Sequence, residues 1–252
     1  LTMNFQGQTI LITGGAQGIG KSIVQSFLSL NAKVMALDID PIEKTLFDHQ
    51  ENLESIKLDL SSPEKIEEFC LSIKDKKIDT FIGNAGILSY KNIDNFSHQD
   101  AHQIFDVNLL GHLKLIQNLK TNIAQSNLKK IILLSSINAQ FGVPGSILYN
   151  MTKASIESAV KSLCVDLADQ QITVNGIAPG FIKTRMSVLA DGTDEFENND
   201  FKEIYLKQKK LPIGRHGKPQ DIANVAVFLA SPLANYINGQ IINVDGGVTS
   251  TF

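Results

Sequence analysis

Short apolar runs alternate along this chain with longer stretches in which apolar residues recur every three or four positions. Short runs that lead into glycine, asparagine, aspartate or serine are typical of buried strands, and the longer periodic stretches are typical of helices. The pattern predicts seven strands, at residues 9–13, 33–38, 55–59, 80–84, 130–135, 173–178 and 240–244. It predicts five helices, at residues 18–30, 63–74, 97–127, 148–168 and 219–230, the third long enough to be interrupted.

Strands that alternate with helices in this way are typical of repeated βαβ units, whose strands are parallel because each helix carries the chain back along the sheet. We therefore expect an α/β protein with a doubly wound, Rossmann-type parallel sheet of seven strands and helices on both faces. Helix starts are marked by Ser62 before Pro63 and by Ser97 three residues before Asp100. Because no linker, repeat or low-complexity tract divides the chain, residues 1–252 are expected to form a single domain.

Residues 187–210 interrupt the alternation of strands and helices. The stretch begins with acidic residues and ends with basic ones. An insertion of this length before the last helix is either a solvated surface excursion or a lid over a substrate site, because long loops in compact domains often carry function. The charge pattern alone favours neither interpretation, and we keep the segment as a candidate lid.

The composition is that of an ordinary globular protein. Of 252 residues, 43% are hydrophobic and 19% are charged, which excludes a disordered, collagen-like or coiled-coil chain. Lys and Arg total 23 against 26 Asp and Glu, so the chain has no basic excess with which to bind a nucleic acid or an anionic membrane. No apolar run approaches the roughly 18 residues of a membrane span, and we expect a soluble, cytoplasmic protein.

A glycine-rich turn joins the first predicted strand directly to the first predicted helix. It reads Thr13-Gly14-Gly15-Ala16-Gln17-Gly18-Ile19-Gly20. Glycines permit positive φ and let a backbone approach a ligand closely, and the helix that follows presents free amides to a pyrophosphate. The spacing Gly-x-x-x-Gly-x-Gly differs from the common Gly-x-Gly-x-x-Gly. Alone, the turn fits either a dinucleotide site or a flexible connection that binds nothing.

Asp38, at the end of the second predicted strand, favours the dinucleotide interpretation. A carboxylate at this place can accept hydrogen bonds from both hydroxyls of an adenosine ribose. It would repel the 2′-phosphate of NADP, and neither Gln17 nor Ile39 offers a compensating cation. We therefore expect NAD in preference to NADP. The Asp40-Pro41 turn nearby leaves open a plain strand-end role for Asp38.

A tyrosine and a lysine one helical turn apart provide candidate acid–base chemistry. Tyr149 and Lys153 occupy positions i and i+4 of a predicted helix, so their side chains project from the same face. A nearby ammonium favours the phenolate, and we expect Lys153 to lower the pKa of Tyr149 from its ordinary value of about 10. By itself this spacing is common on solvated helices.

These features and several further motifs together resemble the short-chain dehydrogenase/reductase family from Gly7 through Gly247, nearly the whole chain. The matching positions are Thr13-Gly14-x-x-x-Gly18-x-Gly20, Asp59-Leu60, Asn84-Ala85-Gly86, Asn108, Ser136, Tyr149, Lys153, Pro179-Gly180 with Thr184, and Val244-Asp245-Gly246-Gly247. Ser136 fits the family's catalytic serine better than Ser135 because it precedes Tyr149 by the family spacing of 13 residues.

The resemblance implies catalytic roles for four residues. Tyr149 would exchange a proton with the substrate oxygen while a hydride moves between the substrate and nicotinamide. Ser136 would hydrogen-bond that oxygen. Lys153 would hold the nicotinamide ribose and lower the pKa of Tyr149, and Asn108 would order a water that relays protons to Lys153. The cofactor performs the redox chemistry, and the protein positions it and stabilises charge on the reacting oxygen.

The resemblance also implies the contacts with NAD. The expected cofactor-binding residues are Gly14, Gln17, Gly18, Ile19, Gly20, Asp38, Asp59, Leu60, Asn84, Ala85, Gly86, Tyr149, Lys153, Pro179, Gly180, Ile182 and Thr184. The chain departs from the family at Gly83, where the family has asparagine. That departure puts one sheet-stabilising hydrogen bond in doubt, but it removes no catalytic atom.

No metal site is expected. His98 and His102 stand at i and i+4 of a predicted helix with Asp106 next in the row, but no third ligand comes from another segment. Cys70 and Cys164 form no Cys-x-x-Cys pair, so we expect reduced residues. The apolar stripes of helices 97–127 and 148–168 are either core or subunit interface, and the resemblance implies a homotetramer that uses these two helices.

Three classes of function compete: an NAD-dependent oxidoreductase acting on a secondary alcohol or ketone, a non-catalytic NAD-binding regulator, and an interaction protein on the same scaffold. The filled asparagine, serine, tyrosine and lysine positions favour the enzyme. Its substrate pocket is expected to be lined by the candidate lid and by Ile87, Leu88, Asn138, Gln140, Phe141 and Phe181.

Side-chain amides and an acidic lid favour a small uncharged substrate, which would be a sugar, a polyol or a hydroxy-ketone. The alternative is a 3-oxoacyl-[acyl-carrier-protein] reductase. An acidic carrier would need a basic rim around the site, for which Lys129 and Lys130 are the candidates.

Overall fold

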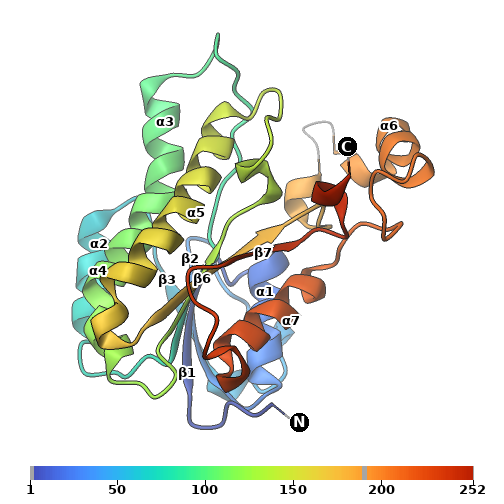
Figure 1. The fold of residues 1–252 in the computed structure, drawn as a ribbon. Helices are drawn as coiled ribbons and strands as arrows, with labels where there is room; N and C mark the ends of the chain where they lie inside the picture. Colours follow the sequence, from blue (N-terminus) through green and yellow to red (C-terminus); the bar gives the residue numbers. More distant parts are fainter. Residues whose placement is uncertain (1–2, 189–191, 252) are drawn as a thin grey trace.

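A seven-stranded parallel sheet forms the centre of the computed structural model, which describes residues 3–188 and 192–251 (Figure 1). The strand order is β3-β2-β1-β4-β5-β6-β7, so the predicted doubly wound sheet is confirmed. The strands are β1 (Thr9–Thr13), β2 (Lys33–Asp38), β3 (Leu53–Lys57), β4 (Thr80–Gly83), β5 (Lys130–Leu134), β6 (Thr173–Pro179) and β7 (Ile241–Val244). The helices are α1 (Gly18–Leu28), α2 (Pro63–Ser72), α3 (His98–Phe105), α4 (Gly111–Ala124), α5 (Ile147–Asp166), α6 (Asn199–Phe201) and α7 (Pro219–Ala230).

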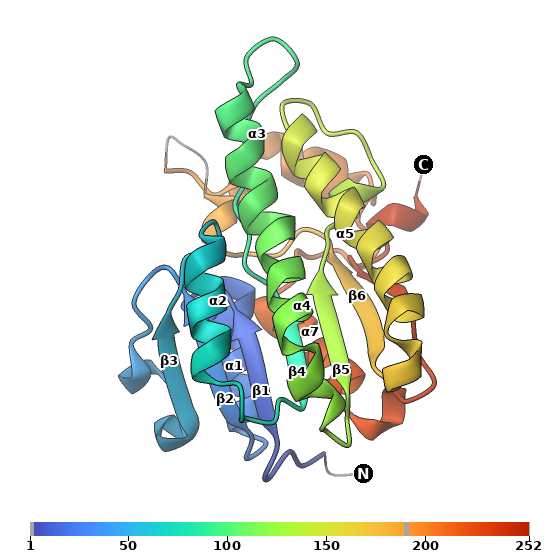
Figure 2. The same cartoon turned by 90° about the vertical axis from the view of Figure 1, so that its left-hand side faces the viewer.

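The helices form a layer on each face of the sheet. Helices α2, α4 and α5 cover one face, and α1 and α7 cover the other (Figure 2). Because successive side chains of a strand point to opposite faces, Ile10 and Ile12 of β1 pack with α1 and α7, whereas Leu11 packs with α2, α4 and α5. All three side chains are buried, as expected for a strand covered on both faces.

The strand order reverses beside β1, which lies between β2 and β4. In open α/β sheets the crevice at the carboxyl ends of the strands, next to such a reversal, is where ligands bind. The glycine-rich turn follows β1 at this edge. The fold therefore collects the loops after β1, β2, β4, β5 and β6 around one place.

The predicted helix 97–127 is interrupted. It comprises α3, a π-helical turn at Asp106–Leu110, and α4. The predicted start is confirmed, since Ser97 Oγ accepts from the Asp100 amide at 3.1 Å while Asp100 Oδ2 accepts from the Ser97 amide at 2.8 Å. Single π-helical turns are often found at functional sites, and this one contains Asn108.

The two lysines predicted for a basic rim lie at the wrong edge of the sheet. Lys130 is the first residue of β5, so it and Lys129 stand at the amino ends of the strands, away from the glycine-rich turn. Lys130 is 2% exposed, and its Nζ donates to Asn235 Oδ1 at 2.9 Å. Burial lowers its pKa. The predicted rim is therefore wrong.

Residues 1–2, 189–191 and 252 lie outside the described residues, and with them part of the predicted lid 187–210. In the two ranges that the structure does describe, no helix combines the length and the apolar character needed to cross a bilayer.

Candidate active site

A cleft of about 1030 Å³ opens at the carboxyl edge of the sheet. It brings together every residue predicted for the site except Asn108. These are Gly14, Gln17, Gly18, Ile19, Gly20, Asp38, Asp59, Leu60, Asn84, Ala85, Gly86, Ser136, Tyr149, Lys153, Pro179, Gly180, Ile182 and Thr184. They come from segments far apart in sequence, and the parallel topology unites them because every strand ends at the same edge.

The glycine-rich turn at one end of the cleft is packed tightly against the turn after β4. Gly14 has φ +71°, and a Cβ on Gly20 would overlap the Gly14 carbonyl oxygen. Asn84 Nδ2 donates to the carbonyl oxygens of Thr13 and Gly14 at 3.0 and 3.1 Å. Since α1 begins at Gly18, its free amides face the cleft at a place where no side chain blocks a pyrophosphate.

Asp38 and Asp59 close the same end of the cleft from the neighbouring strands. Asp38 is the last residue of β2, as predicted, and its Oδ2 accepts from the Ala16 amide at 2.9 Å, which ties β2 to the glycine-rich turn. Asp59 Oδ1 accepts from the amide of Ser61 at 2.9 Å, and hydrogen bonds from Ser61 lower the pKa of Asp59. Both carboxylates therefore have fixed positions and line the cleft.

Ser136, Tyr149 and Lys153 meet in the middle of the cleft. Tyr149 and Lys153 project from α5, and Lys153 Nζ lies 5.6 Å from the centre of the Tyr149 ring. Ser136 follows β5 and lines the cleft. Ser135 Oγ instead donates to the Lys153 carbonyl oxygen at 3.1 Å and to Glu157 at 3.2 Å. Both serines line the cleft, but the Ser135 hydroxyl is engaged with α5, and the assignment of Ser136 as the catalytic serine stays a prediction.

The pKa of Tyr149 shifts in the direction opposite to the sequence prediction. Burial raises it to about 12, although a hydrogen bond with Ser136 acts to lower it. Burial also lowers the pKa of Lys153 to about 8, and its Nζ donates to the Leu134 carbonyl oxygen at 2.9 Å. The expected pKa depression of Tyr149 is therefore wrong for this structure, because loss of solvent around the phenol is the largest influence on its pKa.

Asn108 lies behind the cleft and is completely buried. Its Oδ1 accepts from the Ile87 amide at 2.8 Å, and its Nδ2 donates to the Ile87 carbonyl oxygen at 3.0 Å and to Thr152 at 3.2 Å. The side chain thus fastens the loop after β4 to α5. These contacts do not test the predicted role of Asn108 in ordering a water, which stays a proposal.

His112 occupies the space left by the sequence departure at Gly83. A Cβ on Gly83 would lie 3.1 Å from the His112 ring. Thr13 Oγ1 accepts from the amides of Asn84 and Ala85, so its hydroxyl proton points to His112 Nε2 at 2.9 Å. His112 Nδ1 then donates to the Asn108 carbonyl oxygen at 3.1 Å. Burial lowers the pKa of His112 to about 4, in keeping with this neutral bridge.

The other end of the cleft is covered by the segment between β6 and α7, residues 180–188 and 192–218, which we call the cap. Its own small core joins Phe196 and Phe201 to Phe181, with ring centres 6.3 and 5.2 Å from that of Phe181. On its outer side, Lys202 pairs with Glu197 at 2.8 Å. The segment is therefore a folded unit with a charged exterior, and part of it lines the cleft.

The substrate-pocket prediction holds for five of its six named residues. Ile87, Leu88, Asn138, Phe141 and Phe181 line the cleft. Gln140 does not, because its Nε2 donates to Asn243 Oδ1 at 3.1 Å and to Glu157 at 3.3 Å. The prediction for Gln140 is wrong, because hydrogen bonds with residues of β7 and α5 hold its side chain away from the cleft. Ser187, Glu195, Tyr205 and Lys210 of the predicted lid also line the cleft, whereas Tyr90, Gln103 and Arg185 are cleft residues that the sequence did not reveal.

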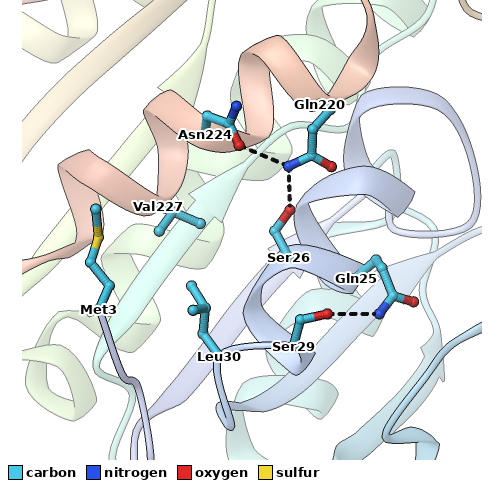
Figure 3. A pocket seen from close by; sticks show the side chains of 8 residues that line it. All are labelled: Met3, Gln25, Ser26, Ser29, Leu30, Gln220, Asn224 and Val227. Atoms are coloured by element: carbon cyan, nitrogen blue, oxygen red, sulfur yellow. Dashed lines mark hydrogen bonds between the residues drawn. The ribbon is translucent and has the colours of Figure 1, made fainter. Parts of the chain in front are cut away.

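A second hollow lies between α1 and α7 on the outside of the molecule (Figure 3). Its polar side chains satisfy one another: Gln220 Nε2 donates to Ser26 at 2.9 Å and to Asn224 at 2.8 Å. None of its lining residues is titratable. In the described ranges, moreover, no three His, Cys, Asp or Glu side chains gather as a metal site would require. The cleft is thus the place where acid–base groups converge.

Comparisons with known proteins match the chain over nearly its whole length. Residues 14–249 match a family model described as enoyl-(acyl carrier protein) reductase. A 3-oxoacyl-[acyl-carrier-protein] reductase of Thermotoga maritima is 30% identical, covering 98% of this chain and 99% of the relative. The structure of a short-chain dehydrogenase family protein from Francisella tularensis is 30% identical with a TM-score of 0.84, covering 97% of this chain and 99% of that one. An aldohexose dehydrogenase of Thermoplasma acidophilum is 26% identical with a TM-score of 0.86, covering 98% and 96%.

Proposed function

The chain belongs to the short-chain dehydrogenase/reductase family of oxidoreductases, which use a nicotinamide cofactor, and from this we propose that it interconverts a secondary alcohol and a ketone with NAD(H), Tyr149 acting as general acid and base. The observation that carries the proposal is the meeting of Ser136, Tyr149 and Lys153 in one cleft with the glycine-rich turn. A regulator that only bound the cofactor would have no need for these three groups together.

The glycine-rich turn fits a dinucleotide, because side chains at Gly14 or Gly20 would fill the cradle beside α1. Bound there, the nicotinamide would donate or accept the hydride. The raised pKa of Tyr149 keeps its phenol protonated at neutral pH, so in the reduction direction the Tyr149 hydroxyl donates a proton to the carbonyl oxygen. The Ser136 hydroxyl donates a hydrogen bond to that same oxygen.

Lys153 and Asn108 support Tyr149, the proton donor. The Lys153 ammonium, held by the Leu134 carbonyl oxygen, faces the Tyr149 ring and stabilises negative charge on the phenol when it gives up its proton. Asn108 fixes the loop after β4 through Ile87, and a Cβ on Gly86 in this loop would lie 3.6 Å from Lys153 Nζ. In the oxidation direction the phenolate form of Tyr149, which the Lys153 ammonium stabilises, takes the hydroxyl proton.

Asp38 supports NAD as the preferred cofactor. Its carboxylate lines the cleft beside the glycine-rich turn, where the adenosine ribose would lie, and it is bound to the Ala16 amide through one oxygen. A 2′-phosphate placed there would meet a negative charge. Arg185, a cation that also lines the cleft, donates to Gln17 Oε1 at 3.3 Å and has no salt bridge with Asp38 among the described residues.

A small polar substrate, such as a sugar, a polyol or a hydroxy-ketone, is supported by the cleft lining. Asn138, Gln103, Tyr90 and Glu195 offer hydrogen-bonding groups beside apolar side chains. The relative from Thermoplasma acidophilum is named for an aldohexose. Reduction of a 3-oxoacyl-carrier substrate is the second candidate, favoured by the name of the Thermotoga maritima relative. The burial of Lys130 removes one of the cations that a basic rim would have used.

A homotetramer is part of the same proposal. Apolar side chains are exposed on the face formed by α5 and the π-helical turn before α4, where Met151 and Leu110 are each 49% exposed and Val165 is 72% exposed. Covering such a face in a symmetric contact would stabilise an assembly. Light scattering after size-exclusion chromatography measures the mass directly, and a monomer would contradict it.

Turnover measured through NADH absorbance tests the function. We expect oxidation of at least one sugar or polyol by the purified chain with NAD, and loss of kcat by about 10²–10⁴-fold in Tyr149→Phe with NADH binding nearly unchanged. Near-normal turnover in Tyr149→Phe would refute the assignment of Tyr149. Faster reduction of acetoacetyl-carrier protein than oxidation of any polyol would favour the second candidate, and NAD binding without any turnover would favour a regulator.

A further inference from the structure

Glu195 differs from its acidic neighbours in the cap. Three of those neighbours are neutralised by lysines: Asp194 by Lys183 at 3.0 Å, Glu197 by Lys202 at 2.8 Å and Glu203 by Lys207 at 2.7 Å. Within residues 3–188 and 192–251, the Glu195 carboxylate has neither a hydrogen-bond donor nor a cationic partner. It is partly buried and lines the cleft that contains Tyr149.

The position of Glu195 is fixed by the residues on either side of it. Asp194 Oδ1 accepts from the Phe196 amide at 3.1 Å, which makes the backbone turn at this point. Phe196 is 4% exposed and stacks on His216 with ring centres 5.0 Å apart. Because the contacts of Asp194 and Phe196 hold the backbone on both sides of Glu195, they also fix where Glu195 enters the cleft.

Tyr90 lines the same cleft as Glu195. Partial burial and the charge of Glu195 raise the pKa of Tyr90, while burial and the charge of Asp194 raise the pKa of Glu195 itself. Tyr90 in turn raises the pKa of Tyr149. Glu195, Tyr90 and Tyr149 thus line one cleft. In the part of the chain that the structure describes, no salt bridge joins Glu195 to Lys153, Arg185 or Lys210, the cations that line this cleft.

We propose that Glu195 is the substrate-recognition residue of the cap: its carboxylate accepts hydrogen bonds from a second hydroxyl of a neutral polyhydroxylated substrate and repels anionic substrates. This inference rests on the proposed alcohol–ketone chemistry at Tyr149. A half-buried carboxylate without donors is costly, and a ligand hydroxyl supplies the missing donor. The amides of Gln103 and Asn138 in the same cleft suit a neutral, hydroxyl-rich molecule.

Four probes separate this inference from a merely structural role. They are trans-cyclohexane-1,2-diol, cyclohexanol, D-sorbitol and D-gluconate, each assayed with NAD on the full chain. The two rings differ by one hydroxyl, and gluconate adds a negative charge to an open-chain polyol. The variant is Glu195→Gln, and the matched control is Glu197→Gln, which removes a carboxylate from the solvent side of the same turn. NADH affinity, measured by fluorescence, checks that each variant is folded.

The wild-type chain should prefer diol to mono-alcohol and sorbitol to gluconate in kcat/KM. Glu195→Gln should reduce both preferences roughly ten- to hundredfold, through KM more than kcat, with NADH affinity unchanged and Glu197→Gln without effect. If Glu195→Gln keeps both preferences, or if the wild type prefers cyclohexanol or gluconate, the inference is wrong while the proposed function stands. If the wild type oxidises none of the four probes and no other alcohol, the proposed function fails and the inference with it.

Discussion

The two ends of the cleft are held in place by different kinds of interaction. At the glycine-turn end, the strand ends are joined by partly buried hydrogen bonds, such as those from Asn84 to the carbonyl oxygens of Thr13 and Gly14. At the cap end, the wall rests on a small aromatic cluster around Phe181 and is edged by exposed ion pairs. One end is therefore continuous with the sheet, and the other is a separate packing unit placed over it.

This difference divides the consequences of substitution. A change at the glycine-turn end disturbs hydrogen bonds that the sheet itself uses, so stability and cofactor binding should change together. A change at the cap end should alter the choice of substrate and leave the sheet intact. Such a division would let one scaffold keep its proposed redox chemistry while the cap determines what is oxidised.

Gly20→Ala should have the largest effect. Its Cβ would overlap the Gly14 carbonyl oxygen and lie 2.6 Å from Asn84 Nδ2, so the turn must shift. We expect the free energy of unfolding to fall by about 3 kcal/mol and NADH binding to weaken by roughly a hundredfold. Urea unfolding and fluorescence titration measure the two quantities. Gly142→Ala, where a Cβ would meet nothing within 4 Å, is the matched control. Unchanged NADH affinity in Gly20→Ala would show that the turn does not hold the cofactor.

The buried His112 bridge should make stability depend on pH. Burial lowers the pKa of His112 to about 4, whereas in the unfolded chain it lies near its ordinary value of 6.5. Between these two pKa values the unfolded state binds the proton more readily than the folded state. The stability that neutral His112 contributes is therefore present above pH 6.5 and is lost as the pH is lowered below it. We expect a loss of about 2 kcal/mol from pH 7 to pH 5.

Urea unfolding at several pH values measures this loss. The variant His112→Asn, which has no titrating ring, should lose that part of the slope, whereas His98→Asn, at an exposed position on α3, should keep it. An identical slope in wild type and His112→Asn would mean that other groups carry the pH dependence.

Asp38→Asn should shift the choice of cofactor by a smaller amount. Removing the charge beside the glycine-rich turn also removes its repulsion of a 2′-phosphate. The ratio of kcat/KM for NADPH to kcat/KM for NADH should therefore rise by roughly tenfold. The neighbouring exposed residue Asp40 provides the control variant Asp40→Asn. The Asp38 assignment fails if the wild-type chain already uses NADPH at least as efficiently as NADH.

Lys202→Gln should have the smallest effect. It breaks the ion pair with Glu197 on the outer side of the cap, where both side chains are well exposed to solvent and the attraction is screened. We expect an unchanged midpoint of urea unfolding and an unchanged KM for every substrate. A marked rise in KM would show that surface charges, and not the aromatic cluster, hold the cap in place.

Much of the fold could be read from local pattern. The alternation of buried strands with periodic helices fixed the class, and Ser62 and Ser97 marked helix starts that the structure retains, with Ser62 Oγ accepting from the Lys65 amide at 3.4 Å. The glycine-rich turn and the residues at the strand ends could be placed at one site because parallel strands end at a common edge. These are properties of neighbouring residues and of topology, which a single sequence carries.

The local pattern of the chain was thus enough to predict the sheet, the glycine-rich turn and the spacing of Ser136, Tyr149 and Lys153. Folding was needed to raise the pKa of Tyr149, to pack His112 and Leu133 over Gly83, to turn Gln140 away from the cleft and to bring Glu195 into it without a partner among the described residues. The physical reason is that burial and the distances between segments remote in sequence set these properties, and no local period or spacing encodes them.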